Sequence, residues 1–192
     1  ITSRNRIARI TDTGVLVPGF NPGTGFNNNA YGIALDPVAL HVTVVGDFTS
    51  YNGPAVGRIA RINALTGALI AYPAANNGNS SGADGTIRTM TRQPDGRILI
   101  AGSFTTYNGI PRSGIARLEP DGSLDTSFTP KGNAGGVLAF ASDLNGGPGS
   151  ANLFARPIVV GNFSNFYGSG FKGVARLLGG SFPGVWYQPS EI

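Results

Sequence analysis

An eight-residue motif that recurs along the chain limits its possible folds more than any other feature. GDFTSYNG at 46–53 appears again as GSFTTYNG at 102–109, and a looser copy, GNFSNFYG, stands at 161–168. A catalytic motif is normally needed once, whereas a motif repeated at a regular spacing belongs to the architecture of a repeat protein. The sequence therefore predicts an array of similar structural units.

A second motif, a short apolar stretch around an arginine, follows each octapeptide and gives nearly the same period. Successive copies start 52, 56 and 59 residues apart, and the octapeptides start 56 and 59 residues apart. The motifs stay fixed while the spacing drifts, so we expect repeated strands joined by loops of different length. The four copies are RIARI at 6–10, RIARI at 58–62, GIARL at 114–118 and GVARL at 173–177.

Within one unit the pattern predicts short β-strands separated by tight turns. RILIAGSF at 97–104 is a continuous apolar run bounded by turn residues, which is typical of a strand buried on both faces. Pro94-Asp95-Gly96, Asn108-Gly109 and Asp121-Gly122 are turn sequences in which glycine supplies positive φ. No window has a helical period of useful length, so we predict an all-β fold. The expected strands of this unit are 86–93, 97–104, 114–119 and 123–128.

Four-stranded sheets repeated around an axis are the blades of a β-propeller, and we predict a β-propeller-like array of about three and a half units. A β-solenoid is the alternative, although its coils are usually much shorter than ~50 residues. The chain would be one repeat domain over 1–192 or a segment of a larger propeller. Its approximate units are 6–57, 58–113, 114–172 and the partial 173–192. Phe48, Phe104 and Phe163 are expected to pack between blades, with Tyr51, Tyr107 and Phe166 or Tyr167 beside them.

The two kinds of motif are present in unequal numbers, which bears on how such an array could close. The chain holds four arginine-motif hairpins and three octapeptide hairpins, whereas each blade of a closed propeller uses one of each. A closed propeller also needs at least about four blades. Two copies of the chain would keep the imbalance and leave strand edges open. We therefore expect protein partners or further repeats to cover both ends of the array.

The same motifs carry a resemblance to a known family. The combination of G-x-F-[TS]-x-Y-N-G, I-A-R-[IL], QPDGRILI at 93–100 and PDGSLDTSF at 120–128 resembles the bacterial delta-60 repeat family over essentially the whole chain. The third unit departs most, because DLNGGPGSANLFARP at 143–157 replaces the compact turn. The resemblance implies a propeller-like β repeat of large bacterial surface or secreted proteins and of some phage proteins. It implies no catalytic activity.

Composition excludes several classes of function. Charged residues make up 12% of the chain, and the net charge of +4 comes from arginines spread along the sequence without a basic run. Nucleic-acid binding needs a clustered basic patch, so we predict no nucleic-acid partner. No segment approaches the ~20 apolar residues of a membrane helix. The chain has no cysteine, which leaves no disulfide and no thiolate metal site.

Two residues raise the question of catalysis. Asp12-Thr13-Gly14 is the tripeptide of aspartic proteases, but that chemistry needs two carboxylates sharing a proton, and the tripeptide occurs once. Its glycine occupies the repeat position of Gly122, which favours a hairpin turn. His41 is the only histidine, and no Gly-x-Ser-x-Gly sequence of a hydrolase accompanies it. We therefore expect no enzyme, no catalytic residue and no cofactor.

The arginine of the second motif recurs once per unit and has two interpretations. These side chains could form a ring of ligand contacts, or each guanidinium could bind backbone carbonyls or a carboxylate of an adjacent blade while its stem packs. Because the residue recurs in every unit, we favour the structural role. The four residues are Arg9, Arg61, Arg117 and Arg176.

Loops on a rigid scaffold are where binding usually resides, and the units differ most in the loops at 25–32, 76–85 and 143–152. The second loop, NNGNSSGADG, has the oxygen-rich composition that calcium uses, but it lacks alternating aspartates and a bidentate glutamate, so we expect no metal site. Exposed tyrosine and asparagine side chains bind sugars by stacking and hydrogen bonding, which makes a glycan the alternative partner. The candidate ligand residues are Asn27, Asn28, Asn29, Tyr31, Asn76, Asn77, Asn79 and Asp84.

The sequence thus predicts a non-enzymatic structural or interaction module of a larger bacterial surface or secreted protein, or of a phage virion protein. We expect an extracellular or cell-surface location, with the phage virion as the alternative. The other function left open is that of a lectin-like propeller that binds carbohydrate.

Overall fold

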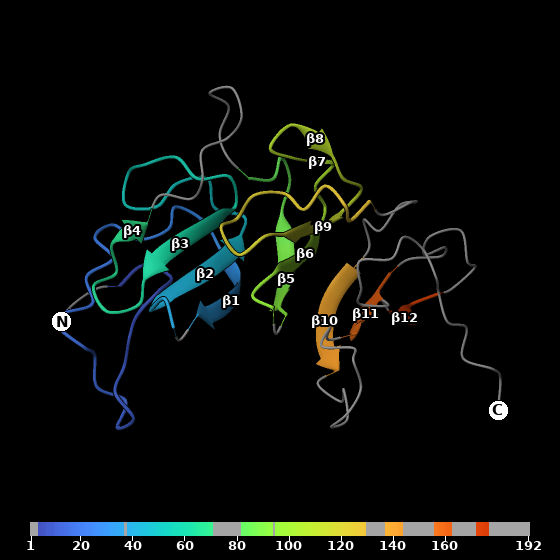
Figure 1. Cartoon of the computed structure of the whole chain (residues 1–192). Coiled ribbons are helices and arrows are strands. Elements are labelled where there is room, and N and C mark those ends of the chain that lie inside the picture. The colour runs from blue at the N-terminus through green and yellow to red at the C-terminus, as the bar shows by residue number, and fades with distance from the viewer. Residues whose placement is uncertain are drawn as a thin grey trace.

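The computed structural model describes residues 4–36, 38–70, 82–93, 95–129, 137–143, 156–162 and 172–176, and every regular element in these residues is a β-strand (Figure 1). The all-β prediction is therefore confirmed. The strands of the first sheet are β1 (Ala30–Asp36), β2 (His41–Gly46), β3 (Ile59–Asn63) and β4 (Leu69–Ile70). The strands of the second sheet are β5 (Ile87–Arg92), β6 (Ile98–Gly102) and β9 (Ile115–Leu118), with β7 (Thr106–Tyr107) and β8 (Ile110–Pro111) as a separate hairpin. The third sheet contains β10 (Val137–Asp143), β11 (Arg156–Gly161) and β12 (Val174–Arg176).

Each sheet is one repeat unit, and the three sheets share one antiparallel topology. Their orders are β1-β2-β3-β4, β5-β6-β9 and β10-β11-β12. The first strand of each sheet has a register shift at the same repeat position, between Ala30 and Gly32, between Ile87 and Thr89, and between Val137 and Ala139. In a solenoid of the β-helix type, successive coils pair as parallel strands. Antiparallel sheets made from consecutive strands are the blades of a propeller-like array.

The fourth strand differs between units. In the first blade β4 pairs with β3, whereas in the second blade it is reduced to a single bridge between Leu118 and Leu124. A matching bridge joins Ile10 to Leu16 in the segment that precedes the first blade. Residues 4–20 therefore occupy the positions of the third and fourth strands of a further unit, joined by this one bridge, and are called the half-blade below.

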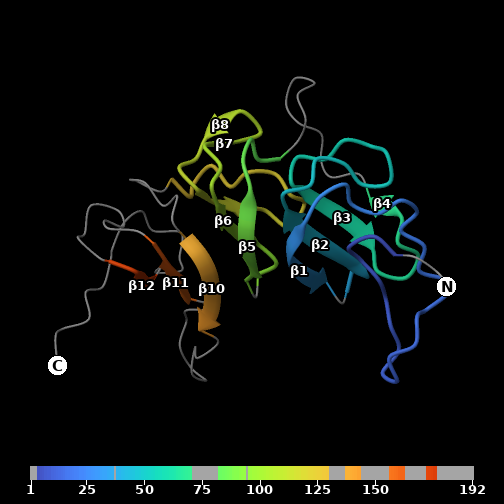
Figure 2. The same ribbon diagram turned by 180° about the vertical axis from the view of Figure 1, so that it is seen from behind.

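The blades stand side by side through their first strands. β1 lies beside β5, and β5 lies beside β10, as both views show (Figures 1 and 2). Two apolar cores fill the gaps. One lies between the first and second blades and joins Val45 and Ile59 to Ile100 and Phe104. The other lies between the half-blade and the first blade and joins Phe20 and Phe26 to Val44, Phe48 and Tyr51.

Within the described residues, no helix is both long enough and apolar enough to cross a membrane. Several predictions fall outside those residues. They concern Phe163, Phe166, Tyr167, Asn76, Asn77 and Asn79, the turn position Pro94, and most of the final unit, 173–192.

Candidate functional site

The octapeptide begins with a glycine that has no room for a side chain. A Cβ added to Gly46 would lie 2.1 Å from the carbonyl oxygen of Asn29, and one added to Gly102 would lie 2.0 Å from that of Thr86. The peptide group that follows each glycine donates to the same carbonyl, from Asp47 N to Asn29 O at 2.9 Å and from Ser103 N to Thr86 O at 2.8 Å. In the first two blades the second strand therefore ends in close backbone contact with the chain that enters the first strand.

The two aromatic residues of the motif join parts of the blade that are distant in sequence. Phe48 and Phe104 are buried in the two interblade cores. The hydroxyl of Tyr51 donates to Gly67 O at 2.6 Å, and the hydroxyl of Tyr107 donates to Gly122 O at 3.1 Å. Both acceptors are glycines of the turn between the third and fourth strands. Burial raises the pKa of Tyr51 to about 12, so this phenol remains a donor at any ordinary pH.

The final Asn-Gly pair forms a tight turn and also holds a neighbouring loop. Asn52 and Gly53 have φ values of 48° and 101°, and Asn108 and Gly109 have φ values of 51° and 77°, as a type I′ hairpin turn requires. The side-chain oxygen of Asn52 accepts from Thr24 N at 3.1 Å, and that of Asn108 accepts from Gly82 N at 2.6 Å. The first glycine, the phenylalanine, the tyrosine and the asparagine of the octapeptide thus have contacts inside the fold, and the last glycine supplies positive φ.

Two predicted ligand residues, Asn27 and Asp84, also take part in these contacts between the octapeptide loop and the loop before the first strand. Asn27 Oδ1 accepts from Thr49 N at 2.9 Å and from Ser50 N at 3.0 Å. Asp84 occupies the equivalent position in the next unit, where its Oδ1 accepts from Thr105 N at 2.7 Å and from Thr106 N at 2.9 Å. Burial by itself would raise the pKa of Asp84, but the hydrogen bonds from Thr105 and Thr106 outweigh it and lower the pKa. These oxygens cap the octapeptide loop.

The other described candidate residues lie at or just before the start of β1; they are Asn28, Asn29 and Tyr31. Asn28 Oδ1 accepts from Asn29 N at 2.8 Å. The Tyr31 hydroxyl donates to Asp47 Oδ2 at 2.6 Å, and Thr86 of the next blade donates to Asp47 Oδ1. The hydrogen bond from Thr86 and then that from Tyr31 lower the pKa of Asp47. Asn29, an exposed Tyr31 and the carboxylate of Asp47 therefore form a small polar cluster near the junction of two blades.

Two rows of arginines connect consecutive units through main-chain acceptors. Arg9 donates to Ala64 O at 3.2 Å, and Arg61 donates to Pro120 O, which is the equivalent carbonyl one unit further along. Arg6 donates to Phe26 O at 2.7 Å, and Arg58 donates to the equivalent Ala83 O at 2.9 Å. Arg9 and Arg61, which are the repeated arginines of the second motif in the first two copies, therefore bind the following unit.

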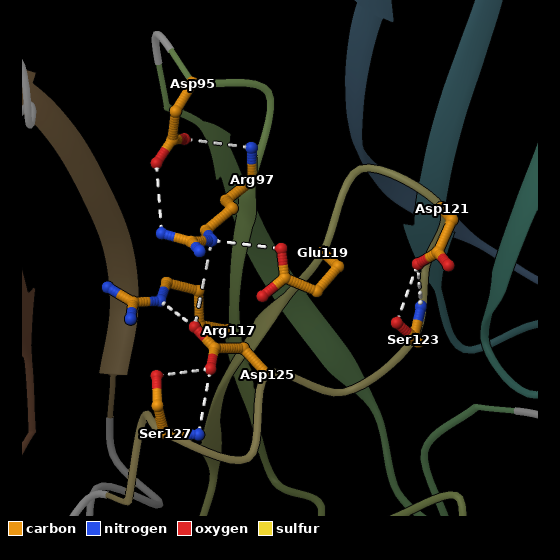
Figure 3. Close-up of polar contacts among 8 residues, drawn as sticks. All are labelled: Asp95, Arg97, Arg117, Glu119, Asp121, Ser123, Asp125 and Ser127. Carbon is orange, nitrogen blue, oxygen red and sulfur yellow. Dashed lines mark hydrogen bonds and ion pairs between the residues drawn. The ribbon is translucent and has the colours of Figure 1, made fainter. Parts of the chain in front are cut away.

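Arg117 departs from the expected contact with an adjacent blade. Its Nε donates to Asp125 Oδ2 at 2.6 Å within its own blade, and both side chains are buried (Figure 3). Asp125 occupies the position that Ile70 has in the first blade. Of the first and second blades, only the second therefore offers its arginine a carboxylate at this position. The backbone of Arg176 lies in β12, and its side chain is outside the described set.

Around this buried pair lies a network of charges at the end of the second blade. Arg97 Nε lies 3.1 Å from Glu119 Oε2 and 3.9 Å from Asp125 Oδ2, and its Nη1 lies 3.4 Å from Asp95 Oδ2 (Figure 3). Ser127 donates to Asp125 Oδ1 from both its amide and its hydroxyl. Burial alone would raise the pKa of Asp125, but the bonds from Ser127 and Arg117 leave it lowered. The Asp-x-Ser spacing of 125–127 is a sequence signal for this local bonding.

The two residues considered for catalysis lie in different local structures. Asp12 is exposed in a turn closed by a bond from Gly14 N to Thr11 O at 3.0 Å, which confirms the hairpin turn. His41 begins β2 and is partly buried. Burial and then Arg61 lower its pKa. Among the described residues no group of three acidic or histidine side chains is placed to hold a metal ion.

The fold and these contacts define the class: a repeat protein built as a β-propeller-like array whose repeated residues hold the blades together. A model of a β-propeller family, a domain of unknown function named DUF5122, matches residues 41–69 and 93–128. Both matches start at or just before the second strand of a blade and run through the third strand into the fourth. No curated protein matches the chain.

Proposed function

We propose that this chain is a non-enzymatic structural and interaction module of the delta-60 repeat type, within a larger bacterial surface or secreted protein or a phage virion protein. The observation that supports it most is the use of the repeated residues. Gly46, Phe48, Tyr51 and Asn52, like their counterparts one unit later, make internal contacts. Because the repeated residues are engaged in contacts within the fold, binding of a partner is left to the surfaces and loops.

Deletion in the organism that carries the protein tests this proposal. Removing the module in frame from the parent protein should abolish display of the parent on intact cells, or its incorporation into purified particles, as measured by immunodetection of an epitope tag. A double variant, Asp12→Asn with His41→Ala, is the matched control and should leave display unchanged. Normal display without the module would contradict the structural role. Loss of display or activity in the folded double variant would revive an enzymatic one.

A lectin-like function is the second candidate, and the cluster at the entry to β1 favours it. Tyr31 is 44% exposed and its hydroxyl is fixed against Asp47, with the Asn29 amide 3.4 Å away. An exposed ring beside amide and carboxylate groups suits a sugar, which needs both a stacking surface and hydrogen-bond partners. A glycan array probed with the wild type and Tyr31→Ala tests it. Binding lost in the variant would support a lectin, and absence of binding by the wild type would exclude sugars on the array.

A further inference from the structure

The segment at the third-strand position of the half-blade, residues 7–10, lacks the neighbour that its counterparts have. Residues 7–10 are equivalent to the start of β3 and to β9. In the complete blades β3 pairs with β2, and β9 pairs with β6. Among the described residues no strand pairs with the inner side of residues 7–10. Ile10 is 61% exposed, whereas its counterparts Ile62 and Leu118 are buried.

The first blade also has an uncovered face, and it lies on the same side as the half-blade. Ile33, Val44 and Ala60 form one row across the sheet, and Leu35 begins the next row. The half-blade covers the outer part of this face, so Val44 and Ala60 are buried in the core that contains Phe20. The inner part is open: Ile33 is 61% exposed and Leu35 is 54% exposed.

The second blade shows what belongs at that place. Its residues equivalent to Ile33 and Leu35 are Met90 and Arg92. Met90 packs into the interblade core, close enough that a Cβ added to Gly32 would lie 3.2 Å from its Cγ. Arg92 pairs with Asp36 at 2.9 Å. Both contacts are made with β1 of the preceding blade, and Val45 of β2 lies in the core against which Met90 packs.

One structural element would satisfy both open positions. We propose that the surface formed by residues 7–10, Ile33 and Leu35 binds the first two strands of a further repeat, as a β-hairpin equivalent to β1–β2. Its second strand would pair with residues 7–10 as β2 pairs with β3, and its face would cover Ile33 and Leu35. This inference rests on the proposed interaction function and names the partner at one end of the array.

The chemistry of the partner follows from the residues that it meets. Strand addition supplies main-chain hydrogen bonds, and the facing side chains give specificity. Ile33 and Leu35 are apolar, whereas Arg92 at the position of Leu35 requires the carboxylate of Asp36. The hairpin bound here therefore presents small and apolar residues, like Gly32 and Val45, without an acidic residue at the position of Asp36.

The repeat register allows a sharp experiment in which a hairpin replaces residues 1–3 and the rest of the chain is kept. Pro111 precedes Arg112, and Arg112 occupies the repeat position of Arg4. Residues 82–111 placed directly before Arg4 therefore supply a hairpin of the right type at the native spacing. The matched control carries the same addition with Ile98→Asp and Ile100→Asp in the added copy, because both residues are buried in the native hairpin.

Hydrogen exchange measured by mass spectrometry is the readout. Docking should slow exchange of the amides of residues 7–10 by at least about tenfold relative to the control. Ile33→Lys in the fused chain should abolish this protection, whereas Val38→Lys, in the exposed turn after β1, should keep it. Equal exchange in the fused chain and its control would overturn the proposal.

The unfused chain separates the remaining outcomes. If light scattering shows a stable dimer in which residues 7–10 are already protected, a second copy occupies the surface and the hairpin is the wrong partner. The result is independent of display on cells or particles. If the hairpin fails to dock but deletion of the module abolishes display, only this inference is overturned. If the hairpin docks but display is normal without the module, only the proposed function is overturned.

Discussion

At the scale of single residues, the octapeptide recurs because its shared glycine, phenylalanine, tyrosine and Asn-Gly positions each have a steric, conformational or hydrogen-bonding requirement. Gly46 has no space for a Cβ, Phe48 fills a core, Tyr51 reaches a distant turn, and Asn52 with Gly53 adopts positive φ. A requirement set by backbone geometry recurs wherever the geometry recurs. The third copy replaces the tyrosine with Phe166 and the asparagine with Tyr167, so it lacks both polar groups.

The tyrosine hydroxyl is the first test at this scale. Tyr51→Phe leaves the Gly67 carbonyl without its donor in a buried place, which should lower the free energy of unfolding by about 1–3 kcal/mol. Urea titration followed by circular dichroism measures the change. Tyr31→Phe removes an exposed hydroxyl and serves as the control, with a smaller effect. A Tyr51→Phe protein as stable as the wild type would show that this bond contributes nothing.

The buried ion pair makes stability depend on pH. The pKa of Asp125 is lowered from its ordinary value of 3.8. Ionisation of this carboxyl group therefore stabilises the folded protein. Its contribution is fully present above about pH 4 and is lost as the pH falls through the lower folded pKa. The urea midpoint should therefore decrease from pH 5 towards pH 2. Asp125→Asn should flatten this decrease, whereas Asp12→Asn should retain it. Identical slopes in all three proteins would contradict this assignment.

At the scale of elements, much of the fold was predictable because apolar runs and turn residues are local. The runs at 86–93, 97–104 and 114–119 contain β5, β6 and β9. The predicted strand at 123–128 is largely wrong, because Asp125 binds the amide and hydroxyl of Ser127 and turns the chain away after the bridge at Leu124. The roles of Asn27 and Asp84 were not predictable, because they depend on which loops the register brings together.

Close approach of strands gives a test at this scale. Gly102→Ala would place a Cβ 2.0 Å from Thr86 O, so the start of β5 and the end of β6 would have to separate. Such overpacking should cost about 1–3 kcal/mol or more. Gly19→Ala is the control, because a Cβ there meets nothing within 4 Å. Thermal unfolding of both variants measures the difference, and an equal effect would show that the backbone relaxes freely.

At the scale of the whole molecule, stability is a sum over units and their interfaces. The second blade has a described neighbour on each side, because β5 lies beside both β1 and β10. All residues of β6 are buried. We therefore expect the slowest amide exchange in β6 and faster exchange in β1, measured site by site in native conditions. Uniform protection of both strands would mean that the array opens as one unit and not blade by blade.

The arginine contacts between units have a consequence for how genes of this kind change. Arg6, Arg9, Arg58 and Arg61 all donate to carbonyl oxygens of the following unit, and a carbonyl is present whatever side chain the acceptor carries. A DNA segment that encodes one whole unit can therefore be duplicated, deleted or exchanged without a compensating substitution at these new junctions. Side-chain matching is needed chiefly near the inner strands, where Asp36 meets Arg92. Recombination can thus change the length of the array in a single step.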